Sequence, residues 1–130
     1  MSDIAIDTSA IIEMMIDGPQ AQAVLDAMNG AELVFVTSVA RVEAAFVMMG
    51  RFGWERAQFE QAWDKLGARE ISVGSAEATM AIGAFEAWGK GRGTAGLNFG
   101  DCFSYALASG RNVPLLFVGD DFARTDIDRA

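Results

Sequence analysis

Short apolar runs alternate along the chain with longer amphipathic segments. The apolar runs are typical of buried strands, and polar residues that suit a helix start follow them. The expected strands are Ile4–Ile6, Leu33–Val36, Ile71–Val73 and Val113–Val118. The expected helices are Ala10–Ile16, Gln20–Met28, Val39–Arg51, Trp54–Leu66, Ser75–Trp88 and Cys102–Ser109. Strands that alternate with helices predict an α/β fold with a mostly parallel central sheet.

Length and composition predict a single globular domain over residues 1–130. The 130 residues are 52% apolar and 22% charged, which is enough to bury a core without disulfide bonds. The lone cysteine, Cys102, excludes an internal disulfide, and the absence of histidine excludes His-based triads and His metal ligands. We find no secretory signal and no run of about 18 apolar residues, so we expect a cytoplasmic protein without a membrane segment.

Five acidic residues occupy positions where a parallel sheet collects ligands. Asp7 follows the first strand, Asp120 and Asp121 follow the last, and Glu43 and Asp101 lie near the starts of two helices. The carboxyl ends of parallel strands and the starts of the following helices share one edge of the sheet. The sequence therefore predicts that these carboxylates converge.

Each of these acids also has a local role that needs no ligand. Asp7 could simply cap the helix that follows it, and Asp101 suits the first turn of its helix. Glu43 has apolar residues one turn away on either side, so its carboxylate projects from a largely apolar helix face. The alternative is a solvated Glu43 that pairs with Arg41 or Arg51.

A group of converging carboxylates would be strongly repulsive unless a cation were bound among them. Mg²⁺ takes oxygen ligands, usually one or two carboxylates together with water and substrate phosphate oxygens. Such an ion can activate water and polarise a phosphoryl group, which would allow phosphodiester hydrolysis without histidine or cysteine. The net charge of −8 counts against a simple electrostatic nucleic-acid binder but is compatible with such a metal enzyme.

Four segments together resemble the PIN domain and, more narrowly, the VapC toxins of bacterial toxin–antitoxin pairs. Their order and spacing along the chain carry the resemblance, which extends almost to the last residue. It implies a three-layer α/β/α fold, Mg²⁺- or Mn²⁺-dependent endoribonuclease activity, a homodimer and inhibition by a VapB-type antitoxin. The segments are Ile6–Ala10, Ser38–Glu43, Leu97–Asp101 and Leu115–Phe122.

The resemblance assigns roles to the acidic residues. Asp7 and Asp101 are expected to bind the metal directly, and Glu43 is expected to bind it or to orient the attacking water. The fourth acid, an outer ligand, is either Asp120 or Asp121. Counting from the strand end favours Asp120, whereas counting back from the following phenylalanine favours Asp121.

Polar and basic residues complete the expected site. Thr8 or Ser9 could position a metal-bound water through its hydroxyl. Lys90 and Arg92, in a glycine-rich basic loop, and Arg41 are expected to contact the RNA backbone, on the basis of their charge alone.

Two other functions fit the same residues. A catalytically silent acidic module could use its surface to bind a basic protein partner. A metal-dependent phosphatase or DNA nuclease could use the same carboxylates, although the absence of a basic groove disfavours long duplex DNA.

Overall fold

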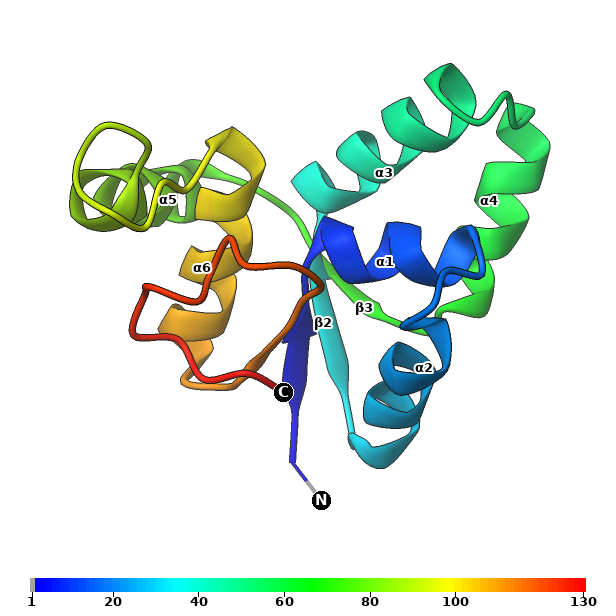
Figure 1. Cartoon of the computed structure of the whole chain (residues 1–130), viewed down its shortest axis with the longest axis horizontal. Coiled ribbons are helices and arrows are strands. Elements are labelled where there is room, and N and C mark those ends of the chain that lie inside the picture. The colour runs from blue at the N-terminus through cyan, green and yellow to red at the C-terminus, as the bar shows by residue number, and fades with distance from the viewer. Residues whose placement is uncertain (1) are drawn as a thin grey trace.

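A computed structural model describes residues 2–130 and shows four short strands and six helices within that range. The strands form one sheet, and helices pack on both of its faces (Figure 1). None of the helices in residues 2–130 has the length and apolar character needed to cross a membrane. The strands are β1 (Ile4–Ile6), β2 (Val34–Thr37), β3 (Arg69–Ile71) and β4 (Leu115–Leu116). The helices are α1 (Thr8–Met15), α2 (Ala21–Gly30), α3 (Ser38–Gly50), α4 (Arg56–Lys65), α5 (Ser75–Trp88) and α6 (Phe99–Arg111).

The sheet is entirely parallel, with the strand order β3-β2-β1-β4. The central strand β1 pairs with β2 on one side, where Ile4 lies opposite Val34, and with β4 on the other, where Ile6 lies opposite Leu116. All four strands therefore end at the same edge. The α/β/α architecture with a parallel sheet, predicted from the sequence, is confirmed.

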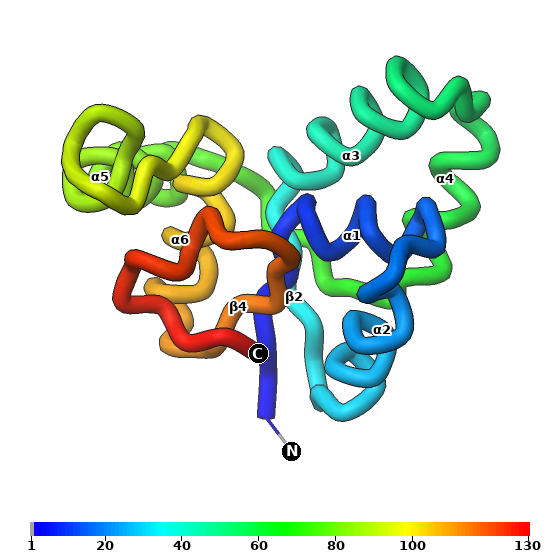
Figure 2. The backbone as a smooth tube through the Cα atoms, viewed as in Figure 1, coloured from blue at the N-terminus to red at the C-terminus, as the bar shows by residue number. Residues whose placement is uncertain are grey.

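Alternation along β1 divides its side chains between two cores. Ile4 and Ile6 face the core beneath α1 to α4, whereas Ala5 faces the core beneath α5 and α6. The trace shows the same separation, with α1 to α4 on one side of the sheet and α5 and α6 on the other (Figure 2). The sheet thus forms the middle of three layers, and its carboxyl edge opens between the two helical layers.

Three of the expected strands have different bounds in the structure. The second was expected over Leu33–Val36 and lies one residue later, at Val34–Thr37. The last strand was expected over Val113–Val118 but covers Leu115–Leu116, because β1 turns into α1 and offers no ladder partner beyond the bond from the Asp7 N–H to the Leu116 carbonyl. The third strand was expected at Ile71–Val73 but lies at Arg69–Ile71. The Val73 N–H there donates to the Ser38 hydroxyl at the start of α3 instead of to a strand.

Candidate active site

Asp7 lies at the centre of the carboxyl edge, between β1 and α1. It is the N-cap of α1, and its Oδ2 accepts a hydrogen bond of 3.0 Å from the Ser9 N–H. The residue is only 3% exposed. Its other carboxylate oxygen, Oδ1, is the one buried side-chain nitrogen or oxygen in residues 2–130 that has no hydrogen-bond partner. Helix capping therefore explains one oxygen of Asp7 and leaves the other available to a ligand.

Glu43 reaches the same edge from α3. The Thr8 hydroxyl donates a 2.7 Å hydrogen bond to Glu43 Oε1, and this bond fixes the carboxylate beside the start of α1. Burial raises the pKa of Glu43, the bond from Thr8 opposes that shift, and the charge of Asp7 adds to it. The observed partner of Glu43 is thus Thr8, and not Arg41 or Arg51.

Gly100 explains how α6 can approach Glu43 so closely. A β-carbon at Gly100 would overlap both oxygens of the Glu43 carboxylate. Gly100 was not among the site residues predicted from the sequence. The only signal for it was a glycine directly before the helix-capping acid, and the use of glycine in turns would account for that pattern equally well.

Asp101 lies on the first turn of α6 in a reciprocal capping arrangement. Its Oδ2 accepts from the Asn98 N–H at 3.1 Å, and its own N–H donates to Asn98 Oδ1 at 3.0 Å. Burial is the main reason that the pKa of Asp101 rises to about 7, and the bond from Asn98 opposes the rise. The charges of Asp7, Asp121 and Glu43 raise this pKa further, so all three carboxylates act on Asp101 through space.

The loop after β4 brings two acids to the edge, and they are not equivalent. Asp120 and Asp121 are both exposed, unlike Asp7 and Asp101. Of the two, only Asp121 has a charge that raises the pKa of Asp101. This interaction favours Asp121 as the acid closer to Asp7, Glu43 and Asp101, which we call the carboxylate cluster.

The hydroxyls predicted to position water are both engaged in the structure. Thr8 donates its hydroxyl hydrogen to Glu43. Ser9 Oγ accepts a 3.1 Å hydrogen bond from the Val118 N–H and so links the start of α1 to the chain beyond β4. Each hydroxyl therefore holds a part of the site together, and a role in orienting water stays a prediction.

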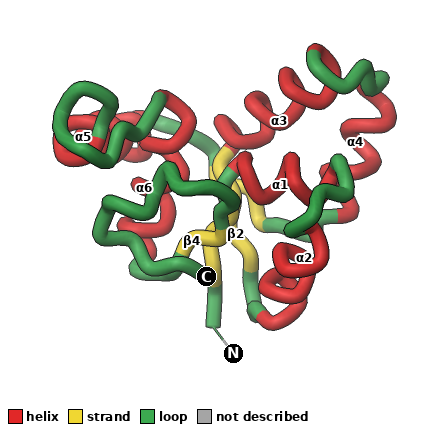
Figure 3. The backbone as a smooth tube through the Cα atoms, viewed as in Figure 1, coloured by secondary structure: helices red, strands yellow, loops and turns green. Residues whose placement is uncertain are grey.

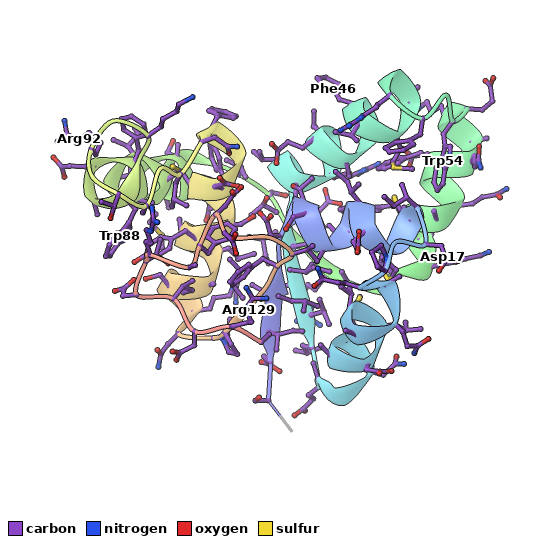
Figure 4. The ribbon with its side chains drawn as sticks, in the orientation of Figure 1. Asp17, Phe46, Trp54, Trp88, Arg92 and Arg129 are labelled. Carbon is purple, nitrogen blue, oxygen red and sulfur yellow. The ribbon has the colours of Figure 1, made fainter. Side chains whose placement is uncertain are left out.

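The basic residues predicted to contact RNA lie apart from the acids or are already paired. Lys90 and Arg92 are exposed on the loop after α5, where Arg92 Nε donates to the Glu86 carbonyl at 3.4 Å. Figure 4 shows Arg92 at the outer end of α5, away from α1 and α3. Arg41, on α3, forms ion pairs with Glu60 at 3.2 Å and with Glu70 at 3.5 Å.

The donor chemistry of this edge suits a hard divalent cation. The buried Oδ1 of Asp7 has no partner, and the acids around Asp101 repel one another. Within residues 2–130, no three Asp, Glu, Cys or His side chains lie close enough to share one ion in this structure. Mg²⁺ needs only one or two direct carboxylates, because water and substrate phosphate complete its shell. Asp7 and Asp101 would therefore hold the ion, with Glu43 beside them.

Sequence comparisons identify relatives of this chain. Residues 4–128 match the PIN domain family. Ribonuclease VapC30 of Mycobacterium tuberculosis is 38% identical over 95% of this chain and 95% of its own length. A VapC ribonuclease of Mycolicibacterium smegmatis is 36% identical over 95% of this chain and 97% of its own length.

Solved structures share the fold at low sequence identity. The crystal structure of Mycobacterium tuberculosis VapC20, described as a sarcin–ricin loop cleaving toxin, has a TM-score of 0.76 and 17% identity. That match covers 98% of each chain. A toxin–antitoxin complex from Klebsiella pneumoniae has a TM-score of 0.71 and 16% identity, with 95% of this chain and 92% of that chain covered.

The family match covers the segments that deliver Asp7, Glu43, Asp101 and the acids after β4. Identities of 36 to 38% to VapC ribonucleases extend over almost the whole chain. The chain belongs to the PIN domain family, and within that family to the VapC ribonucleases.

Proposed function

We propose that this protein is a Mg²⁺- or Mn²⁺-dependent endoribonuclease, the toxin of a VapBC-type toxin–antitoxin pair. The observation that carries the metal-dependent part is the buried, unpartnered Oδ1 of Asp7 among carboxylates that raise the pKa of Asp101. An unpaired buried oxygen is costly, and a cation would satisfy it. The VapC relatives are ribonucleases, which supports RNA as the substrate.

We assign the following roles in metal binding and catalysis to the residues of this chain. Asp7 and Asp101 hold the divalent ion, which when bound supplies charge neutralisation at the scissile phosphate and an acidified water. Thr8 keeps Glu43 beside them through its 2.7 Å hydrogen bond. Glu43, whose burial raises its pKa, would accept a proton from the attacking water. Asp121 contributes an outer carboxylate.

A VapB-type antitoxin is the proposed inhibitory partner. The proposed site of action is the cytoplasm, because an endoribonuclease must meet cellular RNA. Among the structural neighbours, one solved structure is a toxin–antitoxin complex from Klebsiella pneumoniae, and another is VapBC2 from Rickettsia felis bound to a DNA fragment from its promoter. The net charge of −8 favours a basic partner. Large exposed apolar side chains, among them Phe46 and Phe99 at 73% each, support a homodimer as well.

The test is RNA cleavage by purified protein with Mg²⁺, with Mn²⁺ and with EDTA, alongside Asp7→Asn. Asparagine keeps the size and the capping oxygen of Asp7 but loses the charge that binds metal. We expect cleavage only with metal, and a loss of about 100- to 1,000-fold in the variant. In EDTA, the variant should unfold at the wild-type temperature or above, because the substitution removes one of several mutually repelling buried charges.

Other outcomes separate the alternatives. Equal cleavage by the wild type and the variant would identify a contaminating nuclease. A protein that neither cleaves RNA nor gains thermal stability with Mn²⁺ would instead be the silent acidic interaction module. A panel with phosphomonoesters and single- and double-stranded DNA tests the phosphatase and DNA nuclease alternatives.

A further inference from the structure

The loop that carries Asp121 begins directly after β4, where the chain leaves the sheet. We call residues 117–122 the acid loop; Figure 3 shows it as the start of the long irregular segment after β4. The Val118 N–H is bound by Ser9 Oγ, but within residues 2–130 no strand lies beside the loop to accept or donate further. Gly119 adopts a φ of +96°, which only glycine adopts at low cost. The loop therefore needs another source of order.

Arg129 supplies hydrogen bonds to two carbonyls of the acid loop. Its Nη1 donates to the Phe117 carbonyl at 3.4 Å, and its Nη2 donates to the Gly119 carbonyl at 3.3 Å. The guanidinium also lies 4.0 Å from the centre of the Phe117 ring. Figure 4 shows the Arg129 side chain directed towards the chain that follows β4. One planar group thus contacts the loop at three points.

The backbone of Arg129 is itself fixed against the sheet. Residue 129 forms a parallel bridge with Leu115 of β4. The Leu115 N–H donates to the Asp128 carbonyl at 2.8 Å, and the Ala130 N–H donates to the Leu115 carbonyl at 2.9 Å. The guanidinium therefore extends from a rigid base, which limits the entropy lost when it binds the loop.

The acid loop is closed at its other end by aromatic packing. The rings of Phe117 and Phe122 lie 5.0 Å apart, and Phe122 is only 2% exposed. The Ala123 N–H donates to the Asp120 carbonyl at 3.1 Å, which forms a turn around Asp121. Asp121 consequently lies between two anchored points, one of which is the pair of carbonyls held by Arg129.

We infer that Arg129 is a positioning residue, which holds Asp121 towards the carboxylate cluster by binding the carbonyls of Phe117 and Gly119. Lysine cannot replace it fully, because two carbonyls on either side of Val118 match the fixed fork of a guanidinium better than a single ammonium. The part of this inference that concerns metal binding rests on the proposed function. The part that concerns the order of the acid loop does not.

The experiment compares Arg129→Met and Arg129→Lys with the matched control Arg124→Met. Arg124 belongs to the same segment, but its Nη1 binds the Thr94 carbonyl at 3.1 Å, outside the acid loop. Two quantities are measured on folded protein: hydrogen exchange of the Ala123 amide, and Mn²⁺ affinity by calorimetric titration. Steady-state cleavage then gives kcat and KM for each variant.

We expect Arg129→Met to speed exchange of the Ala123 amide and to weaken Mn²⁺ binding by about 10-fold. Arg129→Lys should fall between this variant and the wild type, and Arg124→Met should match the wild type in both measurements. The loss of cleavage should appear in kcat at subsaturating metal and be recovered by excess Mn²⁺.

The inference is overturned if Arg129→Met exchanges the Ala123 amide at the wild-type rate, even when its melting temperature is lower. It is overturned equally if the lysine and methionine variants have the same defect as Arg124→Met. A wild-type protein without Mn²⁺ affinity would contradict the proposed function alone, since amide exchange would still decide whether Arg129 orders the acid loop. Wild-type Mn²⁺ affinity retained in Arg129→Met would contradict only the role of Arg129.

Discussion

The carboxyl edge of the sheet and the basic loop after α5 differ in how firmly the fold fixes their charges. At the edge, Asp7 is 3% exposed and Asp101 is 7% exposed, and each uses one carboxylate oxygen in a helix cap. On the loop, Lys90 and Arg92 are exposed. The acids proposed for catalysis therefore lie at secondary-structure junctions, whereas the two cations of this loop lie on a surface that the core does not position.

Among the variants that test this difference, Gly100→Ala should lose the most activity, because it disturbs the carboxyl edge without removing any acid. The new β-carbon would overlap the Glu43 carboxylate, so Glu43 must leave its place beside Thr8. We expect RNA cleavage to fall by about 10- to 100-fold, because the substitution displaces a carboxylate that we propose to act beside the metal.

Gly83→Ala is the matched control for that substitution. Gly83 also lies within a helix, α5, but apart from its chain neighbours and the backbone of its own helix, no atom lies within 4 Å of the position that a β-carbon would take there. This variant should keep full activity and gain about 0.5–1 kcal/mol in the free energy of unfolding. Full cleavage by Gly100→Ala would show that the close approach of α6 to Glu43 is irrelevant to the reaction.

A smaller effect is expected on the pH dependence of stability. The pKa of Asp101 is about 7 in the folded protein, against 3.8 as its ordinary value. The folded state therefore binds this proton more tightly than the unfolded state. In EDTA, the stabilisation is complete below pH about 4 and is lost as the pH rises through about 7.

Urea unfolding of wild type and Asp101→Asn at pH 5 and pH 8 measures this contribution. The wild type should lose more stability than the variant between the two values. Mn²⁺ should raise the wild-type melting temperature more at pH 8 than at pH 5, because protons compete with the ion. An identical pH dependence in the two proteins would show that Asp101 does not carry the shifted proton.

The smallest effect is expected at the basic loop, from the double variant Lys90→Gln and Arg92→Gln. If these cations contact only the RNA backbone, the variant raises KM by about two- to tenfold at low salt and leaves kcat unchanged. Cleavage kinetics at two salt concentrations test this, since the difference should shrink at high salt. A large drop in kcat would instead place the loop beside the reacting groups and remove its contrast with the carboxyl edge.

The acids could be located from the sequence because strand ends are visible in it. A short apolar run that stops at Asp7 fixes both the strand and the edge at which that residue lies, and the same reasoning applies after β4. Glu43 was more difficult, because its partner Thr8 lies 35 residues away and no local pattern encodes that bond. The choice between Asp120 and Asp121 likewise depends on how a loop closes, which tertiary contacts decide.

Neither the strand lengths nor the contacts that hold the site residues in place could be predicted from the sequence, for a related reason. The apolar run Val113–Val118 has the pattern of the strongest strand, but its ladder ends where its neighbour β1 becomes a helix. The contacts of Arg129 join residues that no helical or strand periodicity links. Hydrophobic patterns identify elements and their ends, whereas partners across the fold come from packing.

The bridge between Arg129 and Leu115 also affects how the molecule meets others of its kind. Exposed sheet edges invite edge-to-edge pairing and aggregation, and natural proteins block them. The outer side of β4 is occupied by residue 129, while the opposite edge strand β3 is three residues long and carries Arg69 and Glu70. Both features disfavour the addition of a further strand to the sheet. Association is left to the helical faces, where Phe46, Ile82 and Phe99 are each more than 70% exposed.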